Sequence, residues 1–152
     1  MKHCAVAGAC VFKSNPRKDN QSEVTILIVR DKWGNWNFPK EYFETSDKSS
    51  LDCAQREVKE ESNIEFAELT KFTTHYEELR TKVRIPNSTI NKHVIIHIGY
   101  ALYYTELKHD GIEIVETMNA TKAKFYELVS NVSEHLALEA VYQLINYNNK
   151  TL

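Results

Sequence analysis

Three glutamates in one short run are the residues best suited to chemistry. In Arg56-Glu57-Val58-Lys59-Glu60-Glu61 the glutamates have spacings i, i+3 and i+4. On an α-helix they would share one face, with neighbouring Cβ atoms about 5–6 Å apart. Carboxylates that close repel one another, and a cation bound between them reverses the repulsion. Hard oxygen ligands suit Mg²⁺ or Mn²⁺. The run therefore predicts a metal site, with a solvated acidic face as the ordinary alternative.

The segment around this run has the pattern of a known family. From Phe38 to Ile64 it resembles the Nudix hydrolase box, G-x5-E-x7-R-E-U-x-E-E-x-G-U, in which U is a bulky aliphatic residue. The positions that fit are Arg56, Glu57, Val58, Glu60, Glu61 and Ile64. A looser resemblance extends along the whole chain. The resemblance implies a Nudix-type fold and a pyrophosphohydrolase activity.

Three fixed positions of that box are occupied differently here. Asn63 stands for the last glycine, and Asn tolerates the left-handed conformation at a helix end. Asp47 stands for the first glutamate, with a shorter reach and one extra residue before Arg56. Glu41 stands for the first glycine and is the most serious departure. If the backbone there needs a positive φ, Glu41 costs about 1–2 kcal/mol, or the loop has changed shape.

The resemblance assigns roles to the residues of the box. Glu57, Glu60 and Glu61 would bind Mg²⁺ or Mn²⁺, and one of them would also accept the proton of the attacking water; which one stays open. Arg56 would orient these carboxylates through bidentate ion pairs, an interpretation we favour over a helix-surface arginine.

Two further metal ligands are implied from outside the helix. A backbone carbonyl next to the Pro39-Lys40 turn often joins the metal shell in this family, which here is that of Lys40 or Glu41. A distal glutamate often contributes as well. Glu116 is the candidate by position and Glu113 the second, while an exposed loop carboxylate is an equally common explanation.

Substrate contacts follow from the resemblance of Pro39-Lys40-Glu41-Tyr42-Phe43-Glu44 to the P-K-G-H-V-E pattern of small diadenosine tetraphosphate hydrolases. Lys40 would meet a phosphate, and Tyr42 stands where that branch carries a histidine close to the phosphates. Tyr76 could stack on a base, although strand aromatics are more often core residues. Arg80, Lys82 and Arg84 could hold an oligophosphate, although a solvated loop is the more common explanation of such a cluster.

The composition agrees with a small enzyme and excludes several other classes. The 152 residues suffice for one domain, spanning 1–152, and the contents of 42% hydrophobic and 26% charged residues are ordinary globular values. The net charge of −2 provides no basic field for nucleic acid. The three cysteines lack a C-x-x-C pair, which argues against disulfides or a zinc knuckle and favours the cytoplasm. We expect no membrane span, and no heptad pattern indicates an oligomeric state.

Hydrophobic periodicity and turn residues predict a mixed α/β (α+β) chain with a Nudix-type α/β/α sandwich, in which a mixed β-sheet lies between helices. Predicted strands are Ala5–Phe12, Val24–Val29, Phe66–Glu78 and an interior strand His93–Tyr104, with short extended pieces at Glu113–Val115 and Ala123–Tyr126. Predicted helices run from a cap at Ser49 or Ser50 to about Ser62, and from about Ser133 to Tyr147.

Together these observations predict a metal-dependent Nudix pyrophosphohydrolase that cleaves a nucleoside diphosphate-linked small molecule, with diadenosine tetraphosphate the first expectation. Hydrolysis of an mRNA cap or RNA 5′ end is the second reading, with RNA a less favoured partner. A third reading is a Nudix-fold module that binds a nucleotide or a protein with little or no catalysis, because the loop half of the box departs from the pattern.

Overall fold

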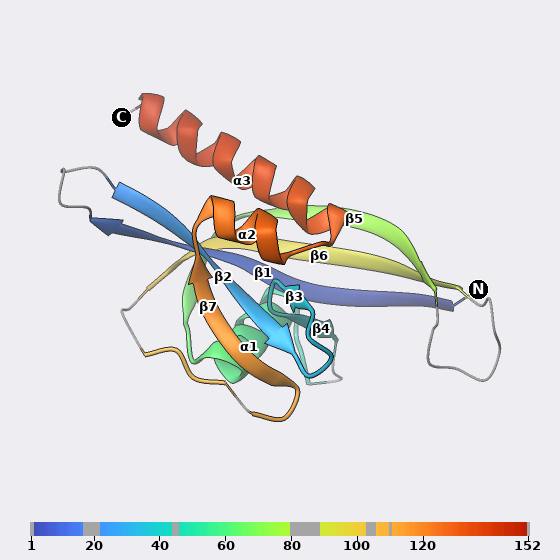
Figure 1. Cartoon of the computed structure of the whole chain (residues 1–152). Coiled ribbons are helices and arrows are strands. Elements are labelled where there is room, and N and C mark those ends of the chain that lie inside the picture. Colours follow the sequence, from blue (N-terminus) through green and yellow to red (C-terminus); the bar gives the residue numbers. More distant parts are fainter. Residues whose placement is uncertain are drawn as a thin grey trace.

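The computed structural model describes residues 2–16, 22–43, 46–79, 89–102, 106–109 and 111–151. Within these residues, seven strands form one mixed sheet with helices on both faces (Figure 1). In chain order the elements are β1 (Lys2–Pro16), β2 (Ser22–Asp31), β3 (Trp36–Asn37), β4 (Lys40–Tyr42), α1 (Ser50–Ser62), β5 (Phe66–Leu79), β6 (Thr89–Ala101), β7 (Ile114–Ala120), α2 (Lys122–Leu128) and α3 (Val132–Thr151). None of the helices in this described part is long and apolar enough to span a membrane.

Strand β1 is the centre of the sheet. The strand order is β3-β2-β1-β6-β5, with β4 also paired to β1 and β7 to β2. Strands β1 and β6 run parallel, while the other pairs run antiparallel. The first part of β1 pairs with β4, placing Gly8 opposite Lys40, and its last part pairs with β2. The mixed sheet predicted from the sequence is therefore confirmed, as is the interior position of β6.

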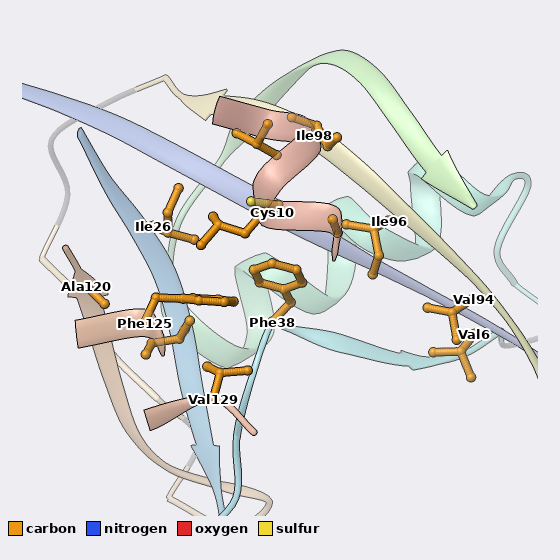
Figure 2. Close-up of a cluster of buried hydrophobic side chains, with 14 residues drawn as sticks. Val6, Cys10, Ile26, Phe38, Val94, Ile96, Ile98, Ala120, Phe125 and Val129 are labelled. Atoms are coloured by element: carbon orange, nitrogen blue, oxygen red, sulfur yellow. The ribbon is translucent and has the colours of Figure 1, made fainter. Parts of the chain in front are cut away.

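Apolar side chains of β1 and β2 contribute to a hydrophobic core on each face of the sheet, because successive side chains of a strand point to opposite faces. One core joins alternate residues of both strands to α1: Ala7, Ala9, Val11 and Leu27 with Cys53, Ala54 and Val58. The other lies beneath α2 and α3 and contains Val6, Cys10, Ile26, Ile28, Phe38, Phe125, Leu138 and Val141. Figure 2 shows Phe38 and Phe125 inside this second core. This arrangement is the predicted α/β/α sandwich.

The short strand predicted at Ala123–Tyr126 is wrong, because these residues belong to helix α2. Thr121 is the N-cap of that helix, and its Oγ1 accepts a hydrogen bond from the Lys124 backbone N–H at 3.2 Å. Only Phe125 of the helix is fully buried. A single buried residue in a short run carries no periodicity, so the capping threonine was the informative signal. The other predicted strands are present with shifted bounds: β6 begins before His93 and ends at Ala101, short of the predicted Tyr104, and β7 begins at Ile114 and extends beyond the predicted Val115 to Ala120.

A buried histidine fastens the start of α1 to the sheet. His97 on β6 is 2% exposed. Its Nδ1 hydrogen-bonds Glu68 Oε2 on β5, and its Nε2 lies 2.9 Å from Ser50 Oγ in α1. An ionised carboxylate only accepts, so Nδ1 donates to Glu68, while Nε2 and the Ser50 hydroxyl share the second hydrogen bond. This contact fixes the first turn of the helix that carries the three glutamates.

Candidate active site

Helix α1 has a defined cap at each end. Ser49 Oγ accepts from the Asp52 N–H at 3.0 Å, which confirms the N-cap predicted from the sequence. At the other end, Asn63 adopts the left-handed conformation, with φ 68° and ψ 17°, and its N–H donates to Lys59 O at 2.9 Å. Its side-chain Nδ2 also donates to Glu106 O at 3.2 Å. The asparagine thus performs the turn for which the family pattern uses glycine.

Substitution at Asn63 is expected to separate the contribution of its left-handed backbone from that of its side-chain hydrogen bond to Glu106. Asn63→Ala should lower the free energy of unfolding by about 1–2 kcal/mol, because an alanine is strained at positive φ. Asn63→Gly should stay within about 0.5 kcal/mol of the wild type, since it relieves the strain but loses the bond to Glu106. Urea unfolding of both variants gives the measurement. Equal losses in the two variants would contradict the assignment of the cost to backbone conformation.

Arg56 is the centre of a cluster of carboxylates. Its Nε and Nη2 each donate to one oxygen of Asp47, both at 2.9 Å. Its Nη1 donates to Glu57 Oε1 at 2.6 Å and to Glu60 Oε2 at 3.3 Å. The side chain of Asp47 is 2% exposed, that of Glu57 7% and that of Arg56 23%. Asp47 therefore reaches the arginine with both oxygens in spite of its shorter side chain and the extra residue before Arg56.

Burial and neighbouring charges shift the pKa values of residues in this cluster. Burial raises the pKa of Glu57, and the negative charges of Glu60 and Glu41 raise it further, while Arg56 opposes both. The hydrogen bonds that Arg56 donates to Asp47 are the main cause of its raised pKa. An added cation would stabilise a carboxylate in this environment, because positive charge favours the ionised form.

The donors fit a hard divalent cation by their chemistry. Glu57, Glu60 and Glu61 bring carboxylate oxygens to one helix, with Glu61 buried and Glu60 exposed. Among the side chains that the structure describes, no three from His, Cys, Asp or Glu converge closely enough to hold a metal ion. Glu57 and Glu60 are turned toward Arg56 instead. Each of the two gives one carboxylate oxygen to Arg56, Oε1 of Glu57 and Oε2 of Glu60.

The first-glycine position of the box has an extended backbone in this protein. Glu41 lies in the extended strand β4, opposite Ala7 of β1. In the described part of the chain, Asn63 is the single non-glycine residue with positive φ. The strain feared at Glu41 is therefore absent, since its backbone is extended. Tyr42, the last residue of β4, is exposed.

Lys40 is held by a residue that the sequence analysis did not select. Its Nζ lies 3.3 Å from Glu134 Oε2, and the Phe38 N–H donates to the other oxygen, Oε1. Glu134 belongs to the first turn of α3 and is 2% exposed. Burial is the largest cause of its raised pKa, with Lys40 and the Phe38 N–H opposing it. Its spacing to the buried Ala137, Leu138 and Val141 is i+3, i+4 and i+7, so a carboxylate within the apolar stripe was the available signal.

The remaining predicted residues lie apart from these contacts or outside the described residues. Glu116 on β7 ion-pairs with Arg30 on β2 at 3.4 Å, and Glu113 with Lys32 at 3.2 Å. Tyr76 belongs to β5, where its backbone is opposite Lys92. The predicted oligophosphate contacts at Arg80, Lys82 and Arg84 fall outside the described residues.

A family model described as the NUDIX domain matches residues 3–134. The chain belongs to the Nudix family. The resemblance drawn from Phe38 to Ile64 is thereby confirmed, and this Nudix protein is a hydrolase acting on phosphorus-containing acid anhydrides. No curated protein sequence matches this Nudix chain significantly.

Solved structures share the fold of this Nudix hydrolase at low sequence identity. A C. elegans Ap4A hydrolase binary complex superposes with a TM-score of 0.76 and 15% identity, covering 94% of this chain and 98% of its own. The NUDIX domain of Shewanella oneidensis NrtR, complexed with ADP ribose, gives a TM-score of 0.66 and 10% identity, covering 95% and 90%. E. coli dihydroneopterin triphosphate pyrophosphohydrolase gives 0.63 and 12%, covering 92% and 97%.

Proposed function

We propose that this Nudix hydrolase cleaves a phosphoanhydride bond in a nucleoside diphosphate-linked small molecule, with a dinucleoside polyphosphate such as diadenosine tetraphosphate as the first candidate. The observation that carries the proposal is the cluster in which Arg56 holds Asp47, Glu57 and Glu60 at the surface of α1. The similarity to the C. elegans Ap4A hydrolase supports the choice of substrate.

Glu57, Glu60 and Glu61, together with the backbone carbonyl of Lys40, would hold Mg²⁺ or Mn²⁺. When bound, such an ion neutralises phosphate charge and makes a water more acidic. Arg56 keeps the carboxylates at fixed positions through its rigid guanidinium. One carboxylate of this helix face accepts the proton of the attacking water, which requires its ionised form.

Substrate positioning is assigned to residues outside the helix. Lys40 and the exposed Tyr42 belong to β4, the strand that precedes α1, and they would contact the phosphates of the substrate. Tyr76, with Arg80, Lys82 and Arg84, would contact the base and the distal phosphates. Glu116 stays a candidate for a distal metal ligand, which would require it to leave its exposed ion pair with Arg30.

The proposal places the activity in one domain, residues 1–152. Helix α3 runs to Thr151, beyond the residues that match the family model, and its Leu138 and Val141 pack in the same core as Val6 and Cys10 of β1. We assign the protein to the cytoplasm, because Cys10 and Cys53 are buried free thiols that fit a reducing compartment.

A binding module with little turnover is the second candidate. The observation that favours it is the orientation of Glu57 and Glu60, which both accept hydrogen bonds from Nη1 of Arg56, while no three described His, Cys, Asp or Glu side chains gather to hold a metal ion. Such a module would bind the same class of nucleotide through Lys40 and Tyr42 without cleaving it.

A hydrolysis screen tests the proposal and separates the candidates. Purified protein with Mg²⁺ or Mn²⁺ is incubated with dinucleoside polyphosphates, nucleoside diphosphate sugars including ADP-ribose, dinucleotide cofactors and capped RNA, and products are identified by mass. Glu61→Gln should lower metal-dependent turnover by at least about 100-fold, since it removes a charged ligand. Glu65→Gln, an exposed carboxylate just after α1, is the matched control and should behave as wild type.

The outcomes of the screen are distinct. Turnover that needs metal and collapses in Glu61→Gln supports the enzyme, and the best substrate identifies its class. Preference for capped RNA would replace the small-molecule substrate by an RNA 5′ end. Turnover unaffected by Glu61→Gln would overturn the assigned site. Nucleotide binding without turnover on any substrate would favour the binding module.

A further inference from the structure

Both carboxylate oxygens of Glu134 contact one short segment that lies almost a hundred residues earlier in the sequence. Oε1 accepts the Phe38 backbone N–H, and Oε2 pairs with Lys40 Nζ at 3.3 Å. The two donors flank Pro39, so the carboxylate spans the whole Phe38–Lys40 segment. The segment leads directly into β4 and from there toward α1. The Glu134 side chain therefore connects α3 to Lys40, the first residue of β4, which precedes α1.

The opposite edge of the Phe38–Lys40 segment is fixed by β1. The Ala9 N–H donates to Pro39 O at 3.0 Å. At Gly8 the approach is so close that an added Cβ would lie 2.4 Å from Lys40 Cβ and 2.5 Å from Pro39 O. The Phe38 side chain is fully buried and stacks on Phe125 of α2, with ring centroids 5.3 Å apart. The segment is thus bounded by the backbone of β1, the aromatic core and the Glu134 carboxylate.

We propose that Glu134 is a positioning residue of the active site, which fixes the Phe38–Lys40 segment and with it the Lys40 carbonyl and ammonium. The inference rests on one part of the proposed function, the metal site in which the Lys40 carbonyl is a ligand, and not on the choice of substrate. Glu134 does not touch substrate or metal itself. It acts through the backbone N–H of Phe38 and the side chain of Lys40.

A role in stability alone explains this carboxylate poorly. The position falls within the apolar stripe of α3, where a leucine or methionine would fill the same space. Burying a charge in such a stripe costs free energy that its hydrogen bonds and ion pair only partly recover. Replacement of a buried ion pair by apolar residues is often neutral or stabilising. A carboxylate here is therefore better explained by the geometry that its two oxygens impose.

Three substitutions separate the contributions of the two oxygens. Glu134→Gln keeps an oxygen that accepts from Phe38 and removes the ion pair. Glu134→Met removes both and fills the apolar stripe, so it is the variant expected to remain folded. Lys40→Met removes the ion pair from the other side and leaves the Phe38 bond. Glu139→Gln, an exposed carboxylate on the same helix, is the control.

Two readouts do not depend on turnover. The dissociation constant for Mn²⁺ is measured by electron paramagnetic resonance on the protein without substrate, and exchange of the Phe38 amide hydrogen reports the tether. We expect Glu134→Met to weaken Mn²⁺ binding at least about 10-fold and to speed Phe38 exchange by at least about 100-fold. Glu134→Gln and Lys40→Met should weaken Mn²⁺ less and leave the amide protected. Glu139→Gln should match the wild type in both.

Different experimental outcomes would overturn the positioning role of Glu134 and the proposed function. If folded Glu134→Met binds Mn²⁺ within twofold of the wild type, the positioning role is overturned, whatever its melting temperature. A wild type that binds no Mn²⁺ overturns it as well. If the variants follow the expected order while the wild type cleaves none of the screened substrates, the inference stands and the proposed function fails.

Discussion

Arg56→Ala is expected to lower kcat/KM by at least about 100-fold, because it removes the cation that holds the carboxylates of α1. A misplacement of about 1 Å at a catalytic group is enough for a loss of this size. The same substitution leaves Asp47 buried without its two hydrogen bonds from Nε and Nη2. Removal of one partner from a buried ion pair costs about 3 kcal/mol of unfolding free energy. Steady-state kinetics and urea unfolding measure the two effects.

Two further variants test whether geometry or charge is responsible. Arg56→Lys keeps the positive charge but loses the fork that serves Asp47 and Glu57 together, so most of the loss in kcat/KM should remain. Lys59→Ala removes a cation from the exposed side of the same helix, where it pairs only loosely with Glu65 at 3.9 Å. It should change kcat/KM less than twofold. Wild-type kinetics in Arg56→Lys would show that charge alone is sufficient.

Helix α1 was predictable from the sequence because every signal within it is local. The cap at Ser49, the buried stripe of Cys53, Ala54 and Val58, and the left-handed Asn63 lie within fifteen residues. Periodicity and capping chemistry act over that range. The family resemblance used the same segment, which is why it and the sandwich fold were both confirmed.

The loop half of the box could not be predicted, because its geometry depends on contacts made far along the chain. Whether Glu41 is strained depends on the pairing of β4 with β1, which the residues between Phe38 and Asp47 do not encode by themselves. Whether Asp47 reaches Arg56 depends on the path of the loop before the helix.

The role of Glu134 was hidden for a similar reason. A sequence pattern shows that the carboxylate interrupts an apolar stripe, but not what it meets there. Its partners Phe38 and Lys40 come from the other end of the chain. Long-range pairing of this kind depends on the sheet topology, since the antiparallel pairing of β4 with β1, which includes Gly8 and Lys40, fixes the position of β4 in the sheet.

Gly8→Ala is expected to damage the site through backbone displacement, although it replaces none of the residues proposed to bind metal or substrate. The new Cβ would stand 2.4 Å from Lys40 Cβ and 2.5 Å from Pro39 O, which is far inside van der Waals contact. The Phe38–Lys40 segment must then move away from β1, and the Ala9 bond to Pro39 O must lengthen. We expect a loss of about 1–3 kcal/mol in unfolding free energy and a fall of at least about 10-fold in kcat/KM.

Gly99→Ala is the matched comparison, because it also forces a Cβ onto a backbone. That Cβ would lie 2.1 Å from Ala67 O and 2.8 Å from the Phe66 side chain, on the β5–β6 pair and not on the Phe38–Lys40 segment. Gly99→Ala should therefore destabilise the protein at least as much while lowering kcat/KM per folded molecule less than Gly8→Ala does. Steady-state kinetics of both variants, corrected for the fraction of folded protein, measure this difference. Equal losses of activity in both variants would show that general destabilisation, and not the position of the Phe38–Lys40 segment, limits turnover.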